Sequence, residues 1–185
     1  MITAQCVCIS CVSSGDRLTS EQQETNRNMI ELTEDLLNHW MSAVLAKGWE
    51  GVRAGQSPFA AAVYTRQGEP ISCEFNHVRR TSHPSRHAEV CAIDRACELL
   101  QRTTLRDCVL ISSAEPCPMC AATAGMTRIP WIVFGAPASV IEQAGYGTLG
   151  IDCHAFFAAA KPNAVIRGGI LADQCSQLLL QNPKQ

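Results

Sequence analysis

The sequence predicts an α/β fold: a three-layer α/β/α sandwich in which helices cover both faces of a mixed five-stranded sheet. Five short apolar segments have the length and composition of strands. The first two are joined by a tight turn, and helical segments alternate with the strands that follow. The 185 residues are 46% hydrophobic and 17% charged, which is typical of a globular chain with one core.

The chain divides into an N-terminal extension, residues 1–27, and a domain, residues 28–185. The extension carries a cluster of thiols, Cys6, Cys8 and Cys11, followed by polar residues. A second metal or redox site is one interpretation of this cluster. We favour the other, an extension without fixed structure, because chain termini are seldom ordered unless they are tied down.

The first half of the domain is predicted to contain a helix and a hairpin. From Asn28 onward, apolar residues recur every three or four positions, which indicates an amphipathic helix, and Gly48 is a natural end for it. The dipeptide Gln67-Gly68 separates two apolar runs and predicts the turn of the hairpin. The predicted elements are a helix over residues 28–48, strands over 58–64 and 71–76, and a polar loop over 77–86.

Strands and helices alternate in the second half. Pro118 suits the first turn of a helix, where no backbone donor is required. Gly135 ends a short apolar strand, and the three glycines between Gly145 and Gly150 indicate a loop. The predicted elements are helices over 87–100, 117–127, 140–143 and 171–180, strands over 108–112, 131–134 and 164–167, and a loop over 145–150.

Composition and charge exclude several classes of protein. The formal net charge of −2 argues against a large nucleic-acid-binding face, which usually requires a basic excess. No apolar run reaches the ~20 residues that span a bilayer, and no Lys or Arg precedes Arg17, unlike the charged start of a secretory signal. The 11 cysteines, an odd number, lie mostly singly among apolar residues, which favours free thiols in a reducing compartment. We therefore expect a cytoplasmic protein without a membrane segment.

Two short motifs carry most of the information about function. His87 and Glu89 stand in His-Ala-Glu, and Cys117 and Cys120 stand in Pro-Cys-Pro-Met-Cys. Two cysteines three positions apart present both sulfurs to one point on a helix, and a helix N-terminus favours thiolates, the form that binds metal. With His87 as a third ligand, the set predicts one Zn²⁺ per chain with an open fourth position, as in catalytic zinc sites.

The charge of the predicted site gives Glu89 a role. Two thiolates neutralise the formal charge of Zn²⁺, so such a zinc should acidify its bound water less than a zinc held by three histidines does. A nearby base would help to deprotonate this water, and Glu89 is placed for that. Residues two apart on a helix point about 200° away from each other. At the first turn this constraint relaxes, so we expect His87 and Glu89 to share one site.

Other interpretations of the cysteine pair remain open. A Cys-x-x-Cys motif also occurs in structural zinc sites and in thioredoxin-like redox sites. A structural site would require a fourth protein ligand, and the next candidates, Cys91 and Cys108, are predicted to face the core. A redox site would leave His87 and Glu89 without a role. We therefore favour a catalytic zinc.

The chain resembles the cytidine-deaminase-like superfamily from about residue 28 to 180, and within it the branch of guanine, cytosine and tRNA-adenosine deaminases. The resemblance rests on three segments: His87-Ala88-Glu89-Val90, Ser113-Ala114-Glu115-Pro116-Cys117-Pro118-Met119-Cys120, and Pro58-Phe59-Ala60-Ala61-Ala62-Val63. It implies that zinc-bound hydroxide attacks an amidine carbon of a base, that Glu89 moves the proton, and that ammonia is released.

The resemblance also implies substrate contacts and an assembly. Asn76 matches the family's base- or sugar-binding asparagine, although an asparagine at a strand end is often only a turn residue. The backbone of Ala88 is a second expected contact. Phe59 is a third, with packing in the core as the alternative. Relatives form dimers, so we expect a homodimer.

The substrate is predicted less sharply than the chemistry. The acidic charge balance and the lack of a basic arm favour a free nucleobase or nucleoside. Guanine comes first, because residues 58–63 and 113–117 look most similar to guanine deaminases. The chain departs from guanine deaminases in having Gly125-Met126 where they have an aromatic residue, and Gly147 after Tyr146 where they have an acid. A tRNA-adenosine deaminase is the alternative, supported by residues 167–175 and opposed by the acidic charge balance. A cytosine-type deaminase, supported by Ile129-Pro130 and the strand after it, and a zinc-binding module without catalysis also remain open.

Overall fold

The computed structural model describes residues 31–160 and 164–184, and within them the predicted mixed five-stranded sheet is confirmed. The strand order is β2-β1-β3-β4-β5. Strand β1 pairs antiparallel with β2 and β3, whereas β3, β4 and β5 run parallel. The strands are β1 (Ala60–Thr65), β2 (Pro70–Phe75), β3 (Cys108–Ala114), β4 (Trp131–Ala136) and β5 (Val165–Arg167).

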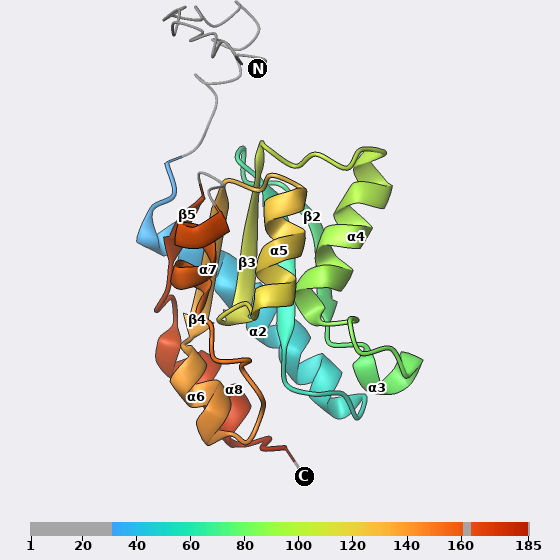
Figure 1. Ribbon diagram of the computed structural model, residues 1–185, viewed down its shortest axis with the longest axis vertical. Coiled ribbons are helices and arrows are strands. Elements are labelled where there is room, and N and C mark those ends of the chain that lie inside the picture. The colour runs from blue at the N-terminus through green and yellow to red at the C-terminus, as the bar shows by residue number, and fades with distance from the viewer. Residues whose placement is uncertain (1–30, 161–163, 185) are drawn as a thin grey trace, which may run out of the picture.

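Helices cover both faces of this sheet, as Figure 1 shows, so the three-layer prediction is also confirmed. Helices α2 (Glu34–Arg53) and α8 (Ala172–Leu180) pack on one face, and the short α6 (Ala138–Gln143) packs against α8. The other face carries α4 (Ala88–Leu100), α5 (Pro118–Met126) and α7 (Cys153–Ala160). Helix α5 lies between α4 and α7.

The alternation of side chains along the central strands explains the two cores. In β1, Ala60, Ala62 and Tyr64 contribute to the core under α2 and α8, whereas Ala61 and Val63 contribute to the core under α4 and α5. Successive side chains of a strand point to opposite faces, so a strand covered on both sides reads as a continuous apolar run. All seven residues of β3 are buried for the same reason.

The first helix runs past the residue at which it was predicted to end. Helix α2 begins after Thr33, whose side-chain oxygen accepts a hydrogen bond from the backbone N–H of Leu36 (3.4 Å), and it continues through Gly48 to Arg53. A Cβ atom at Gly48 would lie 2.6 Å from Cδ2 of Leu178 on α8. The glycine therefore permits close packing of two helices and does not end one. Residues 28–30, also expected in this helix, lie outside the described residues.

Two further helices were not predicted. Residues 77–86 were expected to be a loop, but they contain the four-residue helix α3 (Val78–Thr81), which ends where Ser82 adopts a positive φ of 52°. Helix α7 follows Asp152, whose Oδ1 accepts a hydrogen bond from the backbone N–H of Ala155 at 2.6 Å. Its sequence, Cys-His-Ala-Phe-Phe-Ala-Ala-Ala, has little polar and apolar alternation, so it gives no helical period to detect.

The remaining predicted elements are confirmed within a few residues, including the loop at 145–150 and the last helix. The N-terminal extension with Cys6, Cys8 and Cys11 lies outside the described residues. None of the helices in the described part of the chain has the length and apolar character needed to cross a membrane.

Candidate metal centre

The three predicted metal ligands meet because two helices begin at the same place. His87 is the residue before α4 and Cys117 the residue before α5, and both have extended backbone angles. A side chain at this position usually accepts a hydrogen bond from the first turn of its helix. Neither His87 nor Cys117 does so, and both side chains are therefore available for another partner.

The distances within this group match those required by a tetrahedral zinc ion. The sulfurs of Cys117 and Cys120 lie 3.6 Å apart, and Nδ1 of His87 lies 3.7 Å from the first and 3.6 Å from the second. Zinc bonds of about 2.3 Å to sulfur and about 2.0–2.1 Å to nitrogen, at tetrahedral angles, require separations of about 3.8 Å between the sulfurs and about 3.5–3.6 Å between sulfur and nitrogen. The residues present therefore fit zinc, with the imidazole bound through Nδ1.

The group has three candidate ligands in the described part of the chain. Cys91 and Cys108, considered above as further ligands of a structural site, are buried in the core as predicted. A tetrahedral ion held by three protein atoms keeps one position for water or substrate. The arrangement therefore agrees with a catalytic rather than a structural site.

Contacts among the three side chains shift their pKa values in opposite directions. Hydrogen bonds with Cys120 and His87 lower the pKa of Cys117 to about 4. The contact with Cys117, together with burial, raises the pKa of Cys120. The hydrogen bond with Cys117 also raises the pKa of His87. A zinc ion binds both sulfurs as thiolates, so its binding would release the proton that the raised pKa of Cys120 favours.

Glu89 lies in the same site and is almost completely buried. It is the second residue of α4, and only 6% of its surface is exposed. Burial raises the pKa of its carboxyl group, and the charge of His87 offsets part of this rise. The predicted meeting of His87 and Glu89 is found, because both line one pocket. A buried carboxyl group with a raised pKa beside a metal site is typical of a group that takes up and releases a proton.

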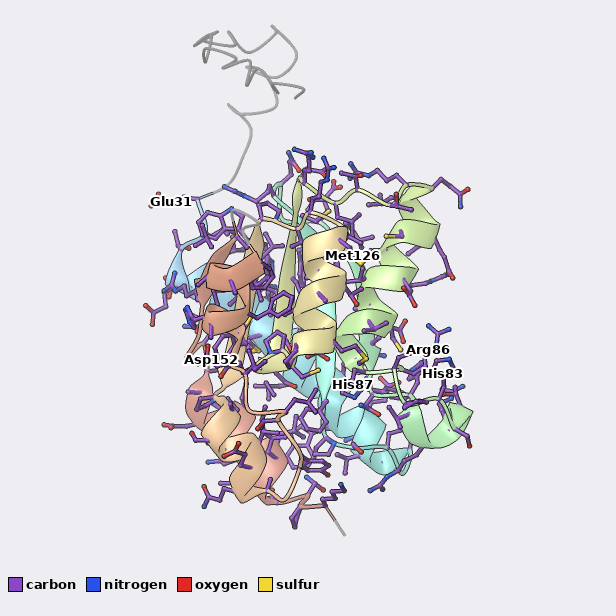
Figure 2. All side chains as sticks on the ribbon, viewed as in Figure 1. Glu31, His83, Arg86, His87, Met126 and Asp152 are labelled. Carbon is purple, nitrogen blue, oxygen red and sulfur yellow. The ribbon has the colours of Figure 1, made fainter. Side chains whose placement is uncertain are left out.

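The metal group, defined as His87, Cys117 and Cys120, adjoins a pocket of about 340 Å³, which is lined in part by His87 and Cys117 and is large enough for a small ligand. Figure 2 shows His87 and Asp152 near the lower end of α5, whereas Met126 lies farther up that helix. The pocket lies beyond the carboxyl ends of the parallel strands β3 and β4, where α/β proteins commonly bind ligands. Its lining comprises Ser57, Phe59, Asn76, Val78, Arg79, His87, Glu89, Glu115, Pro116, Cys117, Ala138, Ile141, Tyr146, Gly147, Thr148, Ile151, Asp152 and Lys184.

Two of the three expected substrate contacts line this pocket. The backbone N–H of Asn76 donates to the carbonyl of Phe59 (2.9 Å), which brings the end of β2 beside the start of β1. Oδ1 of Asn76 accepts a hydrogen bond from the backbone N–H of Val78 (3.0 Å), and the side chain is 4% exposed. The ring of Phe59 meets that of Tyr146 edge to face, with centroids 4.9 Å apart.

Ala88 is placed differently. Its side chain is completely buried in the core under α4 and α5, and the residue is absent from the pocket lining. It is the first residue of α4, so its backbone N–H has no partner within the helix. A substrate contact through this N–H stays a prediction.

Several lining residues were not found from the sequence. Tyr146 was noted only as part of a loop, but its hydroxyl donates to the carbonyl of Asn182 (2.9 Å), and burial raises the pKa of this hydroxyl. Lys184 reaches the pocket because its backbone N–H donates to the carbonyl of Ala144 (2.9 Å). These contacts join segments far apart in the chain, and no local pattern predicts them.

The segment predicted as a polar loop, residues 77–86, contains three arginines, Arg79, Arg80 and Arg86. Of these three, only Arg79 lines the pocket. Arg86 pairs instead with Asp94, with 2.7 Å between Nη1 and Oδ2. Figure 2 shows Arg86 and His83 on the outer side of this region, toward α3. The structure therefore does not gather the three cations into one basic patch.

Comparison with known proteins places the site in a described family. The family model for the cytidine and deoxycytidylate deaminase zinc-binding region matches residues 35–136, which include both motifs. Guanine deaminase of Bacillus subtilis is 34% identical over 112 residues, which cover 60% of this chain and 72% of that protein. A tRNA-specific adenosine deaminase of Haemophilus influenzae is 35% identical over 127 residues, which cover 68% of this chain and 70% of that protein.

A further relative is much longer than this chain. The tRNA(Ile)-lysidine synthase of Deinococcus radiodurans is 31% identical over 155 residues, which cover 83% of this chain but 25% of that protein. Among solved structures, one with 2,6-diaminopurine bound has a TM-score of 0.74 at 26% identity and covers 86% of each chain. Guanine deaminase of Bacillus subtilis has a TM-score of 0.58 at 32% identity, covering 64% of this chain and 73% of that one.

The ligand set predicts the effect of removing single thiols. Replacing Cys117 or Cys120 with Ala should lower the zinc content from about one ion per chain to near zero after dialysis, because two ligands hold zinc poorly. Elemental analysis of the purified variants measures this directly. Cys97→Ala is the control, since Cys97 lies on α4 outside the metal group and should leave zinc unchanged. Full zinc occupancy in both test variants would contradict the assignment.

Proposed function

Because the chain belongs to the zinc-binding family of cytidine and deoxycytidylate deaminases, we propose that it removes the exocyclic amino group of a free nucleobase or nucleoside by hydrolysis. Guanine is the first candidate substrate. The proposal is supported above all by the three ligand atoms 3.6–3.7 Å apart, beside the buried Glu89 in one pocket.

In this reaction one water molecule is consumed, a carbon–nitrogen bond of the amidine breaks, a carbonyl forms and ammonia leaves. Bound zinc would supply Lewis-acid chemistry that makes water more acidic. Glu89 accepts one proton of the attacking water and passes it to a ring nitrogen. It then takes the proton of the hydroxyl group formed on the attacked carbon and gives it to the leaving amine, so that a carbonyl remains. Its raised pKa suits both steps, because a group that gives and takes a proton works best with a pKa near the ambient pH.

Asn76 and Phe59 are the proposed contacts to the base. Because Oδ1 of Asn76 is occupied by the backbone N–H of Val78, its NH₂ group is the part that can donate to an acceptor of the base. Phe59 and Tyr146 supply apolar surface on one side of the pocket. Ala88 is proposed to contribute its backbone N–H at the start of α4.

Guanine is favoured by the relatives, of which one is a guanine deaminase and another was crystallised with 2,6-diaminopurine. Gly147 stands where guanine deaminases have an acidic residue, so the contact of an acidic side chain with the purine is missing at this position. Asp152 is a carboxylate five residues farther along the chain that lines the same pocket. It offers an acceptor for an N–H of a purine.

Adenosine in tRNA is the second candidate, supported by the similarity to tRNA-specific adenosine deaminases. Ammonia release from guanine, adenine, cytosine and their nucleosides, compared with inosine formation in tRNA, separates the candidates. We expect guanine to be the best substrate and tRNA binding to be weak and steeply salt-dependent. Activity on tRNA alone would replace guanine with the second candidate. Bound zinc without activity on any substrate would support a module that has lost catalysis.

The role of Glu89 predicts a separation of chemistry from metal binding. Glu89→Gln should lower turnover by about 10²–10⁴, because general acid–base catalysis is lost, while zinc stays bound. The ammonia assay and elemental analysis on the same preparation measure both quantities. Glu98→Gln, a matched change on the exposed side of α4, should keep the normal rate. A normal rate in Glu89→Gln would remove Glu89 from the proton route.

We also propose that the protein is a homodimer in the cytoplasm, as expected from the sequence. Helices α5 and α7 contain no Asp, Glu, Lys or Arg and lie side by side on one face of the molecule. Neighbouring helices without charged residues are typical of surfaces covered by another subunit. Light scattering at micromolar concentration should return twice the mass of the chain, and a single-chain mass would contradict the proposal.

A further inference from the structure

Glu115 makes contacts that neither zinc binding nor the proposed proton route uses. It lies between β3 and α5, two residues before Cys117, and it lines the pocket. Its Oε2 accepts a hydrogen bond from the backbone N–H of Ala138, and its Oε1 accepts one from the backbone N–H of Cys153, both at 2.9 Å. Its own backbone N–H donates to the carbonyl of Ala136 (2.8 Å).

Both donors belong to helix starts. Ala138 is the first residue of α6 and Cys153 the first residue of α7, so neither N–H has a partner within its helix. A carboxylate only accepts hydrogen bonds, and each of its oxygens faces one of these donors. Its negative charge is also favourable beside the positive ends of two helices. A glutamine would turn an NH₂ group toward one of the donors and lose that bond.

The two anchored residues bracket one wall of the pocket. Between them lie the lining residues Ile141, Tyr146, Gly147, Thr148, Ile151 and Asp152. The loop within this segment includes three residues in positive φ, Gly145 at 83°, Leu149 at 62° and Gly150 at 70°, and Leu149 is 77% exposed. Glu115 therefore holds both ends of this segment, whose exposed loop lies between the buried residues Ala144 and Cys153.

We propose that Glu115 is a positioning residue that fixes this wall, residues 138–153, relative to the zinc ligand Cys117, and thereby sets the affinity of the pocket for the base. The inference rests on the proposed function. One residue, Pro116, separates Glu115 from Cys117, and the ring of a proline fixes its φ angle. The carboxylate of Glu115 therefore stays close to one position relative to Cys117, and its hydrogen bonds fix the wall relative to that ligand. Among the described residues, the side chain of Glu115 has hydrogen bonds to Ala138 and Cys153 and none to the metal ligands or Glu89. We therefore expect it to act on binding of the base and not on zinc.

The test compares two variants that differ in charge and reach. Glu115→Gln keeps the length of the side chain and loses one hydrogen bond, whereas Glu115→Asp keeps the charge and shortens the reach to two separate donors. Each should raise the KM for guanine about 10-fold or more, as expected when a hydrogen bond to a charged group is lost. Zinc content should stay unchanged and kcat should change by less than about 3-fold. Glu69→Gln, in the exposed turn between β1 and β2, is the control.

Two measurements make the result independent of turnover. Calorimetry with xanthine, which has no amino group to lose, should show weaker binding in both Glu115 variants. Hydrogen exchange in peptides covering residues 138–153 should be faster in both, because the anchoring bonds are lost. A lower stability with unchanged KM and xanthine affinity would reduce Glu115 to a structural residue and overturn the proposal, as would loss of zinc.

The outcome for Glu115 is separable from that for the proposed function. If the unchanged protein deaminates no base, the proposed function fails. Hydrogen exchange then still decides the anchoring: unchanged exchange in the variants overturns it, and faster exchange at full zinc content supports it.

Discussion

The meeting of two helix starts at one point is the constraint on which the rest of the site depends. His87 and Cys117 each precede a helix with extended backbone angles, and neither caps its own helix. Their side chains converge with Cys120 at 3.6–3.7 Å. Helix starts carry partial positive charge, so they stabilise the thiolates that a zinc ion requires. Small buried residues beneath, among them Ala88 and Ala121, allow α4 and α5 to lie close to the sheet.

The sheet collects the remaining groups at the same edge. Because β1 is antiparallel to β3, the start of β1 lies beside the end of β3, and the backbone N–H of Ala60 donates to Oγ of Ser113 (3.0 Å). Phe59 and Asn76 extend this edge beyond β1 and β2. The metal group and these two residues therefore reach one pocket from different parts of the chain. Burial of Glu89 in this pocket raises the pKa of its carboxyl group.

Local patterns predicted most of the fold and the metal group but not the far wall of the pocket. Short apolar runs and Pro118 marked their elements correctly, because these signals act over a few residues. The prediction that Gly48 ends the first helix was wrong, because the reason for this glycine is its close packing against Leu178, which lies 130 positions away in the chain. Glu115 stood inside a recognised motif, yet its contacts to Ala138 and Cys153 depend on how the later helices pack. The contact between Tyr146 and Asn182 is equally non-local.

The central claim is that one imidazole and two thiolates hold a zinc ion that keeps a position for water. X-ray absorption at the zinc edge of the purified protein measures this set directly. We expect two sulfur neighbours at about 2.3 Å and two nitrogen or oxygen neighbours at about 2.0–2.1 Å. Four sulfur neighbours, or none, would contradict it.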